Sequence, residues 1–129
     1  RDHEYNFDST QIERNTMLDG LSSLVEAIIE LQPDIEHIAY DKYLEQISNE
    51  LWYEWDPIGI NHIETCRDEY EGYTNIFAKL ACYLSYAELS FYIASICRYQ
   101  LSILSDNVDI KSQKLAYNLI KIAESYDFK

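Results

Sequence analysis

The sequence contains few of the residues that interrupt helices, with three glycines and two prolines among 129 residues. So few turn formers favour a small number of long elements, and in a chain of this length long elements are helices. Apolar residues make up 47% of the chain, which excludes a disordered tail. The length suits one domain with a core of its own.

Cysteine is also scarce, and the three residues present (Cys66, Cys82 and Cys97) form no C-x-x-C pair. Their odd number, and their positions inside predicted helices, indicate small buried thiols in a reducing compartment. A disulfide framework is not indicated, and the histidines lack the spacing of a zinc site. We therefore predict no metal and no cofactor.

Long hydrophobic runs are lacking as well. The most apolar stretch, LSFYIASIC, is too short to cross a bilayer, and there is no signal-peptide pattern. We expect a cytoplasmic protein without a membrane partner. The first residue is Arg1 and not methionine, which leaves open whether residues precede it.

Basic residues are few, and the negative charge is unevenly distributed. Residues 1–71 hold 18 acids and 4 bases, whereas residues 72–129 hold 5 acids and 6 bases. The net charge of −13 disfavours nucleic acids and anionic membranes, because phosphate would be repelled. A negative surface of this kind attracts a cationic partner. The alternative explanation is that the charge only keeps the protein soluble.

Apolar residues recur at helical spacing, and no segment alternates with period two over a useful length. The fold class that we predict is all-α, a single-domain antiparallel bundle of about five helices, residues 1–129, with residues 1–8 as an arm. The predicted helices cover 10–31, 33–54, 63–83, 86–104 and 110–125. Two capping boxes support helix starts, Thr10 with Glu13 and Ser85 with Glu88.

The same spacing predicts which side chains face the core. The residues expected inside are Leu18, Leu21, Val25, Ile28, Ile29, Ile35, Ile38, Leu44, Ile47, Leu51, Trp52, Trp55, Cys66, Tyr70, Tyr73, Phe77, Leu80, Leu84, Leu89, Tyr92, Ile93, Ile96, Gln100, Ile103, Leu115, Leu119 and Ile122.

The segment WDPIGI, Trp55–Ile60, predicts a corner between the second and third helices. Because Asp56 precedes a proline, we expect its backbone to be extended and its carboxylate to cap the N–H groups that follow Pro57. Gly59 can adopt a positive φ, and Ile58 and Ile60 can cover the end of the bundle. A structural corner is favoured over an active-site loop.

Carboxylates one helical turn apart suggest an alternative, a site for a hard cation such as magnesium. The pairs are Glu26 with Glu30, Glu50 with Glu54, and Glu64 with Asp68. All-helical nucleotide pyrophosphatases use paired glutamates, but their Glu-Glu and Glu-x-x-Asp pattern is missing. A di-iron carboxylate bundle needs Glu-x-x-His on two helices, and the chain offers only Asp34-x-x-His37, once. No nucleophile elbow or phosphate-binding glycine loop is present, so we do not predict an enzyme.

Tyrosine is abundant, with 12 residues. Five lie at the edge of the predicted core faces or away from them: Tyr40, Tyr53, Tyr83, Tyr86 and Tyr99. Tyrosine is enriched in protein interfaces, since it offers contact area and a hydroxyl at small entropic cost. Together with the acidic charge, this set favours a binder of basic protein surfaces.

The corner followed by RDEYEGY and IFAKL resembles a group of small helical bacterial proteins, some of them immunity proteins of contact-dependent growth-inhibition systems. The resemblance covers roughly Leu51–Leu84. The matching residues are Trp55, Asp56, Pro57, Ile58, Gly59, Asp68, Glu69, Tyr70 and Tyr73. They mark a shared corner, and no toxin-contacting residue carries over.

The resemblance implies an immunity protein that binds and neutralises a cognate toxin domain, and the acidic charge indicates a basic nuclease as its target. The expected partner-binding residues are Glu50, Tyr53, Glu54, Glu64, Asp68, Glu69 and Glu71, and the structural corner comprises Trp55, Asp56, Pro57, Gly59, Tyr70 and Tyr73. A metal-dependent all-α nucleotide pyrophosphohydrolase and an acidic regulatory adaptor or DNA mimic stay open as alternatives.

Overall fold

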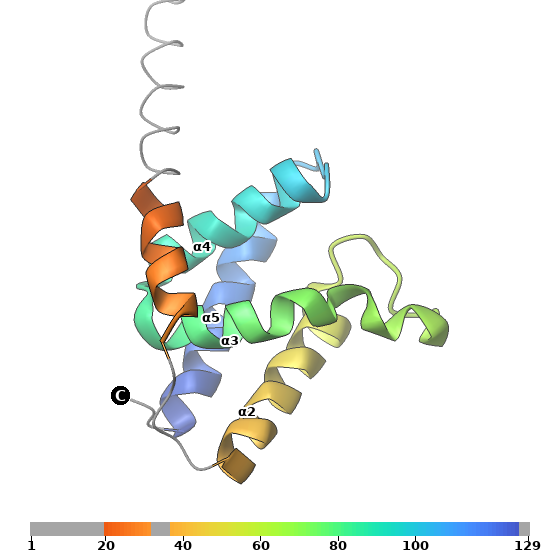
Figure 1. Ribbon diagram of the computed structural model, residues 1–129. Helices are drawn as coiled ribbons and strands as arrows, with labels where there is room; N and C mark the ends of the chain where they lie inside the picture. Colours follow the sequence, from red (N-terminus) through yellow and green to blue (C-terminus); the bar gives the residue numbers. More distant parts are fainter. Residues whose placement is uncertain (1–19, 32–36, 127–129) are drawn as a thin grey trace, which may run out of the picture.

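The computed structural model describes residues 20–31 and 37–126, and this part of the chain consists of helices and connecting turns without a strand (Figure 1). The elements are a helix over residues 20–29, α2 (His37–Asn49), the π-helical η1 (Glu50–Trp55), the 3-10 segment η2 (Glu64–Tyr70), α3 (Glu71–Tyr83), α4 (Tyr86–Ser95), the π-helical η3 (Ile96–Gln100) and α5 (Val108–Tyr126). Because η1, η2 and η3 each extend an α-helix, the described residues form an all-α bundle of five helices, as predicted.

Most predicted helix ends agree with the structure to within two residues. The fourth helix is the exception: it ends at Gln100, and the predicted end at residue 104 is wrong. There the chain leaves the helix because the N–H of Ile103 reaches back to the carbonyl of Cys97, at 2.9 Å. The start of the first helix, its capping box, the arm and residues 33–36 lie outside the described residues.

The capping box at the start of α4 is confirmed. The Ser85 hydroxyl accepts the backbone N–H of Glu88 at 3.2 Å, and the Glu88 carboxylate accepts the backbone N–H of Ser85 at 2.9 Å. Two N–H groups that the helix leaves unpaired are thereby satisfied. This lets α4 begin with only Leu84 and Ser85 between it and the end of α3.

The core face of α2 differs from the predicted one. Ile47, Leu51 and the two tryptophans are buried as expected, but Ile38 is 63% exposed and Tyr43 is fully buried in its place. The Tyr43 hydroxyl donates to the backbone carbonyl of Ala78 on α3, so this tyrosine is buried with its polar end satisfied. The prediction was wrong because Tyr43, Ile47 and Leu51, each four residues apart, share one helical face, whereas Ile38 lies on another.

The predicted burial of Gln100 on η3 is wrong, because its side chain is exposed, whereas Cys97 of the same segment is buried as predicted. Tertiary packing placed the apolar thiol inward and left the amide in solvent. Of the remaining predicted core residues within the described chain, all are buried or packed half-buried against the core. Cys82 is buried as predicted, and Cys66 is half-buried.

The helices pack around one core in which α3 contacts both α2 and α5, and α4 packs against α5 (Figure 1). The helix over residues 20–29 is hydrogen-bonded to α3, because the Lys79 ammonium donates to the carbonyl of Ile29 at 2.6 Å. A cation at a helix C-terminus satisfies an unpaired carbonyl and complements the helix dipole. The antiparallel course of neighbouring helices stays a prediction.

Candidate functional site

The corner between η1 and η2 is organised by a single carboxylate. Asp56 Oδ1 accepts the N–H of Ile60 at 2.8 Å and the hydroxyl of Tyr70 at 2.8 Å, while Oδ2 accepts the N–H of Asn61 at 3.2 Å. The Tyr70 oxygen in turn accepts the N–H of Ile58 at 3.2 Å. The prediction that Asp56 caps the N–H groups beyond Pro57 is confirmed.

The backbone of Asp56 is left-handed, with φ 33° and ψ 62°, so the predicted extended conformation is wrong. Its N–H bonds to the carbonyl of Leu51 at 3.0 Å and closes the last π-helical turn, which requires the chain to reverse at this residue. Aspartate tolerates this conformation better than most residues do. Gly59 has the expected positive φ, 68°.

Aromatic rings lie beneath the corner and fix its position. Trp55 is 2% exposed, and its ring centroid lies 5.6 Å from that of Tyr70, 5.4 Å from that of Phe77 and 6.1 Å from that of Tyr73. Of the two corner isoleucines, only Ile60 packs against the core, and Ile58 is exposed. The corner is therefore an anchored turn and not a mobile loop.

Burial raises the pKa of the Tyr70 hydroxyl above its usual range, and the N–H of Ile58 partly offsets this shift. The hydrogen bond to Asp56 and the charge of that carboxylate raise the pKa further. Because ionised Tyr70 could not donate to Asp56, the protonated hydroxyl is the form that holds the corner.

The structure divides the acids that were predicted to bind a partner. Glu50 and Glu54 border a small hollow whose opposite side is formed by Lys111 and Lys114 of α5. Glu50 also accepts a hydrogen bond from the Asn118 amide at 2.9 Å. These two carboxylates lie among basic and amide groups of the same chain, which weakens the case for them as partner contacts.

The other four acids lie beyond the corner, on η2 and the first residue of α3. Glu64, Asp68, Glu69 and Glu71 are all exposed. Figure 1 shows this segment extending to the side of the bundle, beyond the end of α2. Glu71 accepts a hydrogen bond from Ser48 of α2 at 2.6 Å, which ties the segment to the preceding helix. These residues, together with Tyr53, are called the acidic face below.

Arg67 is the one base between residues 50 and 71, and its guanidinium is directed onto η1. Its central carbon lies 5.4 Å from the ring centroid of Trp52 and 5.2 Å from that of Tyr53, and Nη2 donates to Asn49 Oδ1 at 2.8 Å. Cation–π contact of this kind orders both groups. The contact of Arg67 with the aromatic rings of η1 was not predicted from the sequence, although a single base in an acidic stretch could have indicated that it has a partner nearby.

Tyr53 is 61% exposed, so one side of its ring meets solvent while Arg67 covers another part of it. Of the five tyrosines expected at the edge, Tyr53, Tyr83, Tyr86 and Tyr99 are exposed, and Tyr40 is half-buried against the core.

Within the described ranges, no group of three or more histidine, cysteine, aspartate or glutamate residues is placed to hold a metal ion. Likewise, no helix in residues 20–31 and 37–126 combines the length and apolarity of a membrane span.

Comparison of the chain with protein-family models, with curated proteins and with solved structures found no match.

Proposed function

We propose that this chain is a cytoplasmic immunity protein that binds a cognate toxin domain, a basic nuclease, and covers its active site with the acidic face. The observation that carries the proposal is the arrangement of charge on η2. Three exposed carboxylates lie there, a fourth follows on the first residue of α3, and the one base among them, Arg67, is directed onto Trp52 and Tyr53.

The proposal follows from what a nuclease must present. An enzyme that binds a polyanionic substrate has a groove rich in lysine and arginine, and carboxylates on a rigid support can occupy the phosphate positions of that groove. The support here is the anchored corner, because Asp56 and the aromatic rings below it fix where η2 begins. Tyr53 supplies an exposed aromatic ring of the type that dominates interface energetics.

The resemblance of WDPIGI and RDEYEGY to proteins from toxin–immunity systems supports the same function. The absence of catalytic motifs in the sequence is consistent with a binding protein and not an enzyme. The regulatory adaptor or DNA mimic shares the acidic surface, and the partner recovered in binding experiments separates it from the immunity protein.

Co-expression with the toxin domain encoded by the adjacent upstream gene tests the proposal. We expect wild-type protein to relieve growth arrest and to form a complex that weakens as salt rises. The triple variant Glu64→Gln, Asp68→Asn, Glu69→Gln should lower the association rate by about tenfold, because it removes the charges that steer encounter.

A matched control removes the same number of charges elsewhere on the surface. Glu30, Asp106 and Glu124 are exposed and distant in sequence from the acidic face. Their triple neutralisation should leave the association rate within about twofold of wild type. If both triple variants lose the same activity, net charge and not the acidic face is responsible. Persistent growth arrest with no complex at low salt would sink the proposal altogether.

A further inference from the structure

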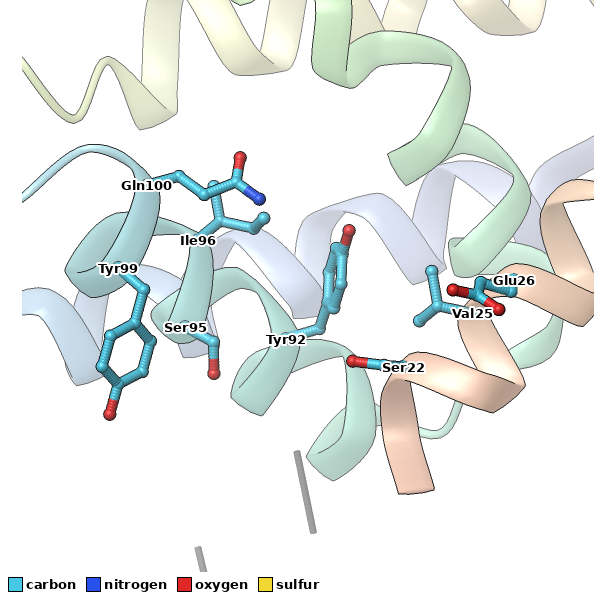
Figure 2. A pocket seen from close by; sticks show the side chains of 8 residues that line it. All are labelled: Ser22, Val25, Glu26, Tyr92, Ser95, Ile96, Tyr99 and Gln100. Atoms are coloured by element: carbon cyan, nitrogen blue, oxygen red, sulfur yellow. The ribbon is translucent and has the colours of Figure 1, made fainter. Parts of the chain in front are cut away.

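A hollow that takes no part in the acidic face lies between the helix over residues 20–29 and the α4–η3 helix. It has a volume of about 340 Å³, within the size range of small-ligand pockets. The described residues that line it are Ser22, Val25, Glu26, Tyr92, Ser95, Ile96, Tyr99 and Gln100 (Figure 2). It is thus built from two segments far apart in the sequence.

The walls of this hollow are apolar and aromatic. Val25 and Ile96 are buried core residues, and Figure 2 shows the Tyr92 ring standing between the α4–η3 side and the side that carries Ser22 and Val25. The Tyr92 ring is held from behind by Phe77, with centroids 6.1 Å apart in an edge-to-face arrangement. Tyr99, 64% exposed, adds a second ring. An extended hydrocarbon stem can pack against such a surface.

The one charged group among the described lining residues attracts a cation. Glu26 contributes an exposed carboxylate, and Ser22, Ser95 and Gln100 contribute neutral oxygens. The Ser95 hydroxyl already donates its proton to the carbonyl of Phe91 at 2.9 Å, which leaves its oxygen as an acceptor. The described lining residues include no lysine or arginine, and tyrosine rings attract cations to their faces.

We infer that this hollow is a binding site for a lysine or arginine side chain of a basic polypeptide partner. The aliphatic stem packs against Val25, Ile96 and Tyr92, and the charged head group meets the Glu26 carboxylate. Charge complementarity selects this occupant, because Glu26 supplies the one charge among the described lining residues and that charge is negative. The site stands independently of the proposed function, since it requires a basic side chain and not a toxin.

The hollow is joined to the corner by a short chain of contacts. The Tyr73 hydroxyl donates to Gln100 Oε1 at 3.4 Å, and the Tyr73 ring meets Trp55 edge-on. A basic partner that contacts both the acidic face and this hollow would therefore bridge η2 and η3.

Two blocked amino acids serve as probes, N-acetyl-arginine methylamide and its uncharged counterpart N-acetyl-norleucine methylamide. Each is titrated into isotope-labelled full-length protein while backbone amide shifts are followed. We expect the arginine probe to shift residues around Ser22, Val25, Tyr92 and Gln100, and the norleucine probe to give at most weak shifts. Glu26→Gln should weaken binding of the arginine probe about fivefold.

Glu30→Gln is the matched control, because Glu30 is exposed one turn after Glu26 and does not line the hollow. It should bind the arginine probe as wild type does. The inference fails if the two probes bind equally, if Glu30→Gln weakens binding as much as Glu26→Gln, or if the shifts fall on the acidic face instead. None of these outcomes depends on whether a toxin complex forms.

Discussion

Asp56 and Asp68 are the same residue type twelve positions apart, and the structure uses them in opposite ways. Asp56 accepts hydrogen bonds from Ile60, Asn61 and Tyr70, and so holds the corner together. Asp68 is exposed on η2, where its charge faces solvent. A carboxylate that organises the backbone contributes to folding, whereas one that only projects from the backbone is available for a partner. The corner and the acidic face should therefore respond differently to mutation.

The largest effect is expected for Trp55→Ala, at the base of the corner. This side chain is 2% exposed and packs against Tyr70, Tyr73 and Phe77. Its removal leaves a cavity that the surrounding rings fill only partly, so the free energy of unfolding should fall by about 3–5 kcal/mol. Denaturant titration measures this loss. Tyr53→Ala, on the exposed neighbour, should cost about 1 kcal/mol or less, and equal losses would contradict the distinction between the two regions.

Asp56→Ala should lower the free energy of unfolding by about 2–3 kcal/mol, because it removes a cap and leaves the buried Tyr70 hydroxyl without an acceptor. The fraction that folds should still bind the toxin domain, since Asp56 is not part of the acidic face. Denaturant titration and binding to the folded fraction are measured side by side. Lost binding with unchanged stability would mean that the corner itself contacts the partner.

Tyr70→Phe removes both hydrogen bonds of the hydroxyl, to Asp56 and from the N–H of Ile58, and should cost about 1–2 kcal/mol near neutral pH. Because the pKa of Tyr70 is raised in the folded protein, the unfolded chain loses this proton first as the pH rises. The stabilisation is complete below the ordinary tyrosine pKa of about 10 and is lost progressively above it.

The free energy of unfolding should therefore fall less between pH 9 and about pH 11 for Tyr70→Phe than for wild type. Burial also raises the pKa values of Tyr40, Tyr73 and Tyr92, so part of the alkaline loss remains in the variant. Identical pH profiles for the two proteins would show that the Tyr70 proton does not stabilise the corner.

The smallest effect is expected for Asp68→Asn combined with Glu69→Gln on the acidic face. Both side chains are exposed, so the free energy of unfolding should change by less than about 0.5 kcal/mol per site, and relief of charge repulsion can raise it. Thermal and denaturant unfolding check this. A loss comparable to that of Asp56→Ala would show that these acids also hold the fold, and would remove the contrast between the two regions.

Local chemistry made several features predictable. The Ser85–Glu88 capping box, the positive φ of Gly59 and the capping role of Asp56 each depend on residues within five positions of one another. Interactions between residues so near in the chain can be predicted from the sequence, because the chain itself keeps the partners close. The all-α class followed in the same way from periodicity and from the scarcity of glycine and proline.

The predictions failed where distant residues decide the outcome. Tyr43 replaces Ile38 in the core because α3 brings a backbone carbonyl within reach of its hydroxyl. Glu50 and Glu54 look identical to the η2 acids in the sequence, yet α5 places Lys111, Lys114 and Asn118 opposite them.

The sequence by itself thus determined the helices, the turn that joins η1 to η2 and the excess of negative charge. Only the tertiary structure decided which of those charges share a hollow with bases of the same chain, and it alone built the hollow between residues 22–26 and 92–100. Backbone conformation depends on neighbours a few residues away, whereas the surroundings of a side chain depend on which helices pack against it. For that reason the corner could be predicted from the six consecutive residues Trp55–Ile60 and the proposed binding surfaces could not.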